Sequence, residues 1–380
     1  MGDQILRPYA VVIGGEVRAG LEIELVDGVI HDVRRHRGLP DMYVLSPAFV
    51  NAHSHLEYRA MQGRFDGLAY WPWIRALTLA KGDESAADVL AACRTAAQEN
   101  VRTGVAFIAE HSDRFGSAQS MQGAGLQGRI YKELLTLGRD PLTTLAGVRA
   151  ACEAETGFGL ACAPSPHAPH TVDEVALRTF AEGAPLSIHV AETTDENEYF
   201  LTHQGPIRDL RDRFGLETPE FEGRVFEYLE HLGLVRRGLQ MVHACDLNEP
   251  EVYRAVEAGA TVAHCPRSNE ALGCPPAKVR EMLDAGMLVG LGLDSVASSG
   301  PIDMFAEMRA AIKVAERSGA HLKAEEVWMM ATTLGAASVG ESGWEVSIGS
   351  QVPLIKIHRE GIQRFDELIA EGQPEDVEWV

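Results

Sequence analysis

Residues 47–57 read PAFVNAHSHLE, and they mark a change in the texture of the chain. The apolar run Ala48–Ala52 has the length and continuous apolar character of a strand buried on both faces. Before it, residues 1–46 contain short strand-like runs punctuated by GG and DG pairs. After it, such runs alternate with helical stretches, a pattern that predicts βα units and a parallel sheet.

Eight buried-strand candidates follow one another: Ala48–Ala52, Gly104–Ala109, Arg129–Leu134, Gly159–Ala163, Leu186–Val190, Gln240–His243, Thr261–His264 and Leu288–Leu293. Eight strands with intervening helices predict an α/β fold, a (β/α)8 TIM barrel over residues 47–340. The tail turns strand-like again at Val346–Ile357 and helical at Ile362–Glu371. We therefore expect residues 1–46 and 341–380 to form a small β-sandwich beside the barrel.

The composition restricts the partners. The 380 residues carry a formal net charge of −21, which repels phosphate backbones and anionic membranes, so neither nucleic acid nor membrane is an expected partner. The six cysteines include no CxxC pair, and the N-terminus lacks the basic and apolar blocks of a signal peptide, so we expect a cytoplasmic protein. We expect a small-molecule substrate as the partner, and the sequence is also compatible with a homodimer.

Metal-capable side chains recur where the predicted strands end, which is where a barrel builds its active site. They are His53, His55, Glu110, His111, His189, Glu192, His243, His264 and Asp294. In HSH the two imidazoles lie two residues apart, and alternate side chains of a strand point to the same side. A lone HxH is commonly a structural pair, but the further strand-end groups favour a metal site.

One divalent ion, Zn²⁺ or Fe²⁺, fits a ligand set of His53, His55, His189 and Asp294 with one position left for water. Such an ion lowers the pKa of water toward neutrality. Glu192 follows the ligand strand and suits a proton shuttle, although a carboxylate favoured by a helix dipole is the ordinary alternative. His243 suits a hydrogen bond to the water, and a buried structural histidine competes with that role. His264 and Cys265 are left out of the ligand set.

The chain resembles the amidohydrolase superfamily, in the branch of cytosine, guanine and S-adenosylhomocysteine deaminases and triazine hydrolases. The matching pieces are PAFVNAHSHLE, SPHAPHTV, IHVAET, MVHA, HCPRSN and GLGLDS, in the family's order. The resemblance implies one metal on the ligand set above and Glu192 as the group that protonates a ring nitrogen. It also implies that His243 orients the nucleophilic water and that Asp294 accepts a proton from it. The segment SIGSQVPLIKI departs from the branch's usual ending.

Within this branch the chain is most similar to deaminases that convert 6-aminodeoxyfutalosine to futalosine in menaquinone biosynthesis. That substrate is an adenine nucleoside with a benzoate-bearing 5′ chain. It needs an aromatic slot for the purine, acceptors for the ribose and a cation for the benzoate. The expected substrate-binding residues are Glu57, Arg59, Asp66, Trp71, Trp73, His167 and Arg267, with Arg64 as a further cation. Tryptophans that only pack, and an arginine that only neutralises Glu57, are the ordinary alternatives.

Other functions remain open. Deamination of S-adenosylhomocysteine, adenosine-type compounds or free bases comes next, followed by triazine chlorohydrolysis. A two-metal cyclic amidohydrolase would need a carboxylated lysine, for which Lys132 is the candidate. A non-enzymatic binding protein would lack a ligand or the shuttle. We also expect the polar segment from Ala191 to Arg213 to form a lid over the barrel mouth.

Overall fold

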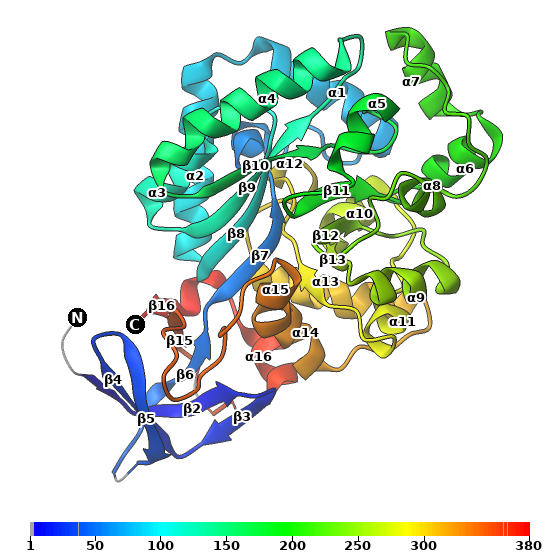
Figure 1. Ribbon diagram of the computed structural model, residues 1–380. Coiled ribbons are helices and arrows are strands. Elements are labelled where there is room, and N and C mark those ends of the chain that lie inside the picture. Colours follow the sequence, from blue (N-terminus) through cyan, green and yellow to red (C-terminus); the bar gives the residue numbers. More distant parts are fainter. Residues whose placement is uncertain (1–3, 37, 360, 363) are drawn as a thin grey trace.

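The computed structural model describes residues 4–36, 38–359, 361–362 and 364–380 (Figure 1). Residues 1–3, 37, 360 and 363, which belong to the predicted flanking segments, lie outside the described residues. Within the described part of the chain, no helix is long and apolar enough to cross a membrane.

The predicted strands form two four-stranded parallel sheets. The first sheet has the order β10-β9-β8-β7, with bounds Ala161–Pro166, Gln127–Leu134, Val105–Ser112 and Phe49–Ser54. The second has the order β11-β12-β13-β14, with bounds Leu186–Val190, Leu239–His243, Thr261–His264 and Val289–Leu291. All eight expected runs are therefore strands.

The two sheets meet at both edges. At one edge, a parallel bridge joins Ser54 of β7 to Asp294 just after β14, and the Asp294 N–H donates to the carbonyl of His53 at 2.8 Å. At the other, the Ser187 N–H donates to Ser165 Oγ at 2.9 Å. The arrangement is a mixed α/β fold of the TIM-barrel type, although the described strand pairing forms two sheets rather than one continuous ring.

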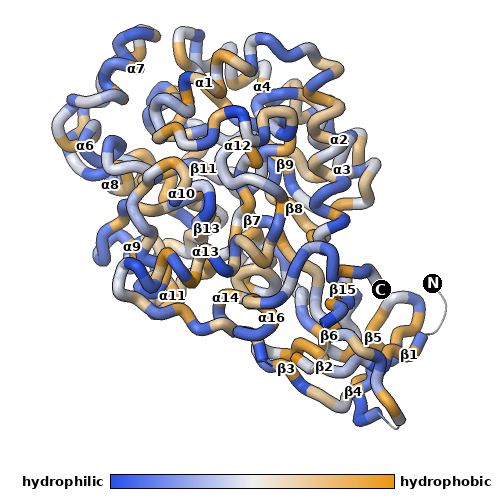
Figure 2. The backbone as a smooth tube through the Cα atoms, turned by 180° about the vertical axis from the view of Figure 1, so that it is seen from behind, coloured by the Kyte–Doolittle hydropathy of each residue, from blue (hydrophilic) through white to orange (hydrophobic). Residues whose placement is uncertain are grey.

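Helices cover the outside of these sheets (Figure 1). The larger ones are α1 (Tyr70–Asp83), α2 (Ala86–Arg102), α4 (Pro141–Glu155), α9 (Glu249–Ala258) and α13 (Met304–Arg317). Sequence signals explain their starts: the Ser85 and Asp88 side chains form a capping box at α2, and Asn248 and Glu251 form one at α9. In Figure 2 the strands β7 and β8 are largely hydrophobic, whereas the outer helices carry hydrophilic residues.

The chain ends come together in a separate region at the lower left of Figure 1. A five-stranded sheet has the order β16-β15-β6-β2-β3, and a three-stranded sheet the order β1-β4-β5. Their bounds are Val377–Trp379, Leu354–Ile357, Asp41–Pro47, Pro8–Ile13 and Glu16–Ala19, then Gln4–Leu6, Leu21–Val26 and Val29–Arg35. β15 pairs antiparallel with β6, so both terminal segments share one sheet. The strand predicted from Val346 begins only at Leu354, and the helix predicted from Ile362 is α16 (Phe365–Glu371).

Strand β7 is anchored between the two regions. Phe49 packs edge-on against Phe305 and Trp328, with ring centroids 5.4 and 5.6 Å apart. The indole N–H of Trp344 donates to the carbonyl of Ala48 at 2.8 Å. Buried aromatic packing of this kind contributes beyond its apolar area. The start of β7 is therefore fixed in place, and with it the HSH segment at its end.

Candidate metal centre and active site

Four histidines and one aspartate, carried by four strands, converge at the strand ends. His53 lies near the end of β7 and His55 directly follows it, His189 lies in β11, His243 ends β12 and Asp294 follows β14. Asp294 Oδ1 lies 3.5 Å from His53 Nε2 and 3.8 Å from His55 Nε2. The ligand atoms of His53, His189 and His243 also lie within 4.8 Å of one another. The expected groups are thus brought together, although His53 and Asp294 lie 241 positions apart in the chain.

Backbone carbonyls orient two of these imidazoles. His55 Nδ1 lies 3.0 Å from the carbonyl of His111, and His189 Nδ1 lies 2.8 Å from the carbonyl of His167. A carbonyl only accepts, so each Nδ1 carries the hydrogen and each Nε2 keeps its lone pair. His53 Nε2 is buried and has no hydrogen-bond partner among the described residues. When Nδ1 donates its hydrogen to a carbonyl, the ring is held in place and the lone pair on Nε2 is free to bind a metal cation.

The electrostatics of the cluster also fit a cation. Burial lowers the pKa of His189 to about 4, and burial with the neighbouring His53 holds the pKa of His55 well below its usual value. Burial raises the pKa of Asp294, but the neighbouring His53 and then His243 outweigh it and hold that pKa well below its usual value. Neutral imidazoles and an ionised carboxylate are the forms that bind a metal.

Backbone strain concentrates at these strand ends. Of the six described non-glycine residues with positive φ, four are Ala191 (51°), His243 (69°), Ala244 (50°) and Asp294 (53°). This left-handed region is costly for residues with a Cβ, and it recurs where a side chain must be aimed for function. The turns after β11, β12 and β14 therefore direct side chains toward one point.

Glu192 lies beside His243, where the sequence places the proton shuttle. Its Oε1 is 3.6 Å from His243 Nε2, and both side chains are buried. On the other side of the ring, Asn269 Nδ2 lies 3.0 Å from His243 Nδ1. An amide N–H donates, so Nδ1 accepts and the hydrogen of His243 sits on Nε2, facing Glu192. Burial, and then the charge of Asp294, hold the pKa of Glu192 well above its usual value.

The expected purine slot is split between two environments. Trp71, at the start of α1, donates its indole N–H to Asp195 Oδ2 at 2.5 Å and is partly exposed. Trp73 is buried and donates to the carbonyl of Ala297 at 3.0 Å, inside a cluster of apolar residues. His167 lies close to the metal cluster, with its ring centroid 4.8 Å from that of His189. Trp73 thus packs within an apolar cluster, Trp71 contacts Asp195 and His167 contacts His189, and a substrate role for each stays a prediction.

The expected cations already have protein partners. Arg59 donates to both oxygens of Glu99, at 2.5 and 2.7 Å. The Arg267 guanidinium donates to the carbonyl of Pro301 at 2.8 Å and lies 3.7 Å from Glu307 Oε2. Bidentate and buried pairs of this kind hold a guanidinium firmly, so neither group is free to receive a carboxylate without giving up a partner.

The expected ribose acceptors lie apart from one another. Glu57 is fully buried, accepts a hydrogen bond from Ser112 Oγ at 2.5 Å and lies 3.9 Å from Lys81 Nζ. Asp66 is exposed.

Lys132, the candidate for a second metal, pairs with buried Glu155 instead of the histidines. Because side chains alternate along a strand, the next residue of β9 points the other way.

That next residue, Glu133, was missed by sequence reasoning. Its ligand oxygen lies within 4.8 Å of ligand atoms of both His55 and His189. His111 was noted but given no role, and its Nδ1 lies 3.0 Å from His53 Nδ1. The available signal was position alone, since both residues lie close to strand ends.

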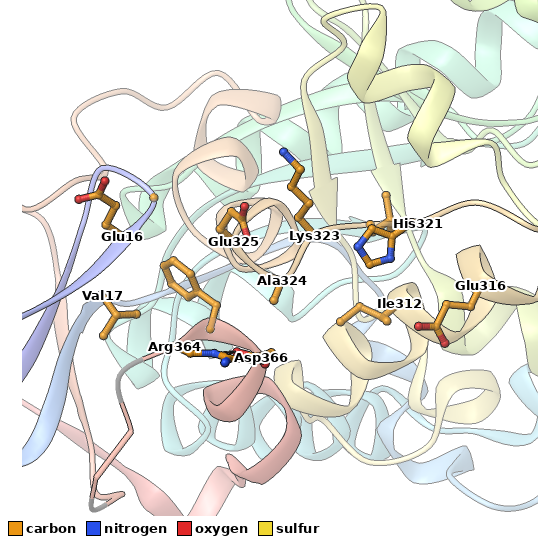
Figure 3. A pocket seen from close by; sticks show the side chains of 13 residues that line it. Glu16, Val17, Ile312, Glu316, His321, Lys323, Ala324, Glu325, Arg364 and Asp366 are labelled. Atoms are coloured by element: carbon orange, nitrogen blue, oxygen red, sulfur yellow. Dashed lines mark hydrogen bonds and ion pairs between the residues drawn. The ribbon is translucent and has the colours of Figure 1, made fainter.

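A cavity of about 750 Å³ lies elsewhere, between the β2–β3 turn, the end of α13 and the start of α16 (Figure 3). Its lining includes charges of both signs, among them Glu16, Glu316, Lys323 and Arg364. None of the expected site residues lines it. The strand-end cluster, rather than this cavity, is the candidate active site.

Histidines and acids gathered at the ends of parallel strands, with a buried carboxyl beside them, define a hydrolytic enzyme on a TIM-barrel-type fold. Residues 44–343 match the Amidohydrolase family, and this chain belongs to that family. It is a hydrolytic deaminase by class.

Among curated relatives, 5-methylthioadenosine/S-adenosylhomocysteine deaminase of Natronomonas pharaonis is 27% identical over 93% of this chain and 82% of its own length. Aminodeoxyfutalosine deaminase of Deinococcus radiodurans is 30% identical over 79% of this chain and 75% of its own. The structure of a zinc-bound adenosine deaminase from Xanthomonas campestris is similar in fold, with a TM-score of 0.83, 22% identity and coverage of 99% of this chain and 90% of that one.

Proposed function

We propose that this protein deaminates an adenine nucleoside and holds one divalent ion, zinc or iron, through His53, His55, His189 and Asp294. The observation that carries the proposal is the buried, unpartnered Nε2 of His53, which lies 3.5 Å from the Asp294 carboxylate. A nitrogen lone pair buried without a donor is costly, and a cation removes that cost. The engaged Nδ1 atoms of His55 and His189 support the same interpretation.

An ion held there supplies Lewis acidity and makes water a better nucleophile near neutral pH. The protein groups do the rest. Glu192, buried and protonated, gives its proton to the ring nitrogen next to the carbon that water attacks. His243, with its hydrogen on Nε2, orients the water, and Asp294 accepts a proton from it. Water adds, ammonia leaves, and an amino group on the ring becomes a carbonyl.

Within the adenine nucleosides, we propose 6-aminodeoxyfutalosine as the first substrate to test, which would place the protein in menaquinone biosynthesis. Support comes from the 30% identity to the Deinococcus enzyme. The matches to methylthioadenosine/S-adenosylhomocysteine deaminases make those thioethers the second choice. Since Arg59 and Arg267 are engaged, exposed Arg64 is the predicted cation that remains for a benzoate. Residues 47–340 form the catalytic region in this proposal, with the terminal segments beside it.

An ammonia-release panel tests the proposal. It compares kcat/KM for 6-aminodeoxyfutalosine, S-adenosylhomocysteine, methylthioadenosine, adenosine, adenine and a chlorotriazine, using protein with one metal equivalent. We expect 6-aminodeoxyfutalosine to be the best substrate. A higher kcat/KM for S-adenosylhomocysteine or adenosine removes the menaquinone assignment and leaves the deaminase. No turnover of any adenine nucleoside overturns the proposed function.

A further inference from the structure

Glu133 is a buried carboxyl group that faces the histidine cluster. It lies at the end of β9 and is 4% exposed. Its Oε1 is buried and has no hydrogen-bond partner among the described residues. The atom lies 3.7 Å from His189 Nδ1, on the inner side of the sheet where the histidines converge.

Nothing in the fold explains this group. A buried polar atom without a hydrogen bond destabilises the fold, because its lost hydration is not replaced by a protein contact. The Lys81 ammonium donates instead to Tyr58 Oη at 2.7 Å and to Asp113 at 2.9 Å. Burial, and then the charge of Asp113, hold the pKa of Glu133 well above its usual value. A bound ligand can supply a donor to this oxygen.

A second metal ion is a poor candidate for that ligand. The nitrogen of His189 that faces Glu133 is Nδ1, and it already donates its hydrogen to the carbonyl of His167 at 2.8 Å. A donating nitrogen has no lone pair for a cation. The lone pair on His189 Nε2 belongs to the cluster with His53 and His243. A hydrogen-bond donor of the substrate fits better than a metal.

We propose that Glu133 contacts the substrate directly and accepts a hydrogen bond from the amino group that the reaction displaces. This inference rests on the proposed function. The attacked carbon must lie beside the histidine–aspartate cluster, and the Glu133 oxygen lies within 4.8 Å of ligand atoms of His55 and His189. In an adenine nucleoside the amino group on that carbon is the one donor of the purine. The ribose hydroxyls lie at the opposite end of the ring system.

This contact makes Glu133 a specificity-determining residue. A carboxyl oxygen accepts from an N–H whether or not the group carries a proton. A chloride on the same carbon cannot donate, and neither can the carbonyl oxygen of the product. The group therefore favours an amine over a halide as the leaving group, and substrate over product. A site that pairs a donor loses much affinity for an analogue without one.

Two variants and two substrates test the contact. Glu133→Leu removes the acceptor at similar volume, and Glu133→Gln keeps one carbonyl acceptor. Each is assayed with the preferred adenine nucleoside and with the analogue that carries chloride in place of the amino group. Both reactions consume one water and give the same oxo product, with ammonia or HCl released. The chloride substrate is thus an internal control for folding, metal content and the other catalytic groups.

We expect Glu133→Leu to lower kcat/KM for the amine by about 10- to 100-fold, because the buried amino group loses its acceptor, and to change the chloride reaction by less than about threefold. Glu133→Gln lies in between. We also expect Glu133→Leu to melt at a higher temperature than the wild type, because an unpaired buried carboxyl is removed. Equal loss on both substrates, or a lower melting temperature, overturns the inference. Wild type that turns over neither compound overturns the proposed function instead.

Discussion

The orientation of each active-site imidazole is set by what its second nitrogen contacts. The carbonyls of His111 and His167 hold His55 and His189, and Asn269 holds His243. Outer contacts of this kind fix the tautomer and aim the free nitrogen. The position of each imidazole therefore depends on these outer contacts as well as on its own strand.

Metal content should depend on the HSH segment. His55→Ala removes a nitrogen 3.8 Å from Asp294 Oδ1, so we expect the purified variant to lose its ion, while wild type holds one equivalent. Elemental analysis measures both. His231→Ala, an exposed histidine on α8 (Val225–His231), is the matched control and should keep the metal. Two equivalents in wild type, or a full equivalent in His55→Ala, would contradict the ligand assignment.

Glu192 should matter for chemistry and leave metal binding intact. Glu192→Gln keeps the shape but cannot transfer a proton, and a general acid–base group contributes about 10²–10⁴-fold. We expect kcat to fall by that order with the metal retained. Glu198→Gln, an exposed residue on the next helix, is the control. Loss of the metal from Glu192→Gln, or a rate near wild type, rules out the shuttle role.

Between β11 and β12 the chain builds two short helices, α6 (Thr194–Thr202) and α7 (Pro206–Phe214), in the segment expected to be a lid. Glu196 accepts from the backbone N–H of Ala191 at 3.0 Å and of Glu192 at 2.7 Å, so the start of α6 holds the turn that carries Glu192, the proposed shuttle. The lid remains a prediction. A side-chain hydrogen bond between Asp195 and Trp71 joins this segment to α1.

Loosening that bond should weaken substrate binding. Trp71→Phe keeps an aromatic ring but removes the indole donor, and one hydrogen bond contributes about 0.5–1.5 kcal/mol net, so KM should rise about 2- to 10-fold with a smaller change in kcat. Trp379→Phe removes an equivalent indole bond, to the carbonyl of Val101 in the flanking region, and should leave KM unchanged. Hydrogen exchange over residues 194–214 should slow when an unreactive nucleoside analogue binds. If binding of the analogue leaves these exchange rates unchanged, the segment does not act as a lid.

Across the whole protein, acidic side chains outnumber basic ones by 55 to 34, and several carboxyls are buried. Glu307 of α13 is one of them, fully buried beneath Arg267. Burial raises its pKa from 4.5 to about 8, despite the charge of Arg267, which lowers it. The folded state thus prefers the protonated form, whereas the unfolded chain ionises freely above 4.5.

Stability should therefore fall as the pH rises from about 4.5 to 8, because the unfolded state loses the proton first. Glu307→Gln cannot ionise and keeps an oxygen for the Arg267 N–H, so its melting temperature should fall less over this window than that of wild type. The difference between the two proteins corresponds to an order of a few kcal/mol. Glu316→Gln, exposed on the same helix, should reproduce the wild-type profile. Parallel profiles for Glu307→Gln and wild type would show that Glu307 does not titrate in this way.

Much of this protein could be predicted from local pattern. Continuous apolar runs identified all eight parallel strands, because a strand buried on both faces must be apolar throughout. The two-residue spacing of His53 and His55 put both rings on one side of β7. Strand ends of parallel sheets share one edge, so His189, His243 and Asp294 were expected there as well, and the structure brings them together.

Pairing across long sequence separations could not be predicted in this way. Arg59 donates a hydrogen bond to Glu99, 40 residues away in the sequence, and β15 pairs with β6 from the other end of the chain. The register of β9 turns Lys132 toward Glu155 and leaves Glu133 facing His189. Such choices depend on which partners packing brings within reach, and no local period encodes them. Alternation and burial are properties of a segment, whereas an ion pair or an unpaired carboxyl is a property of the assembled fold.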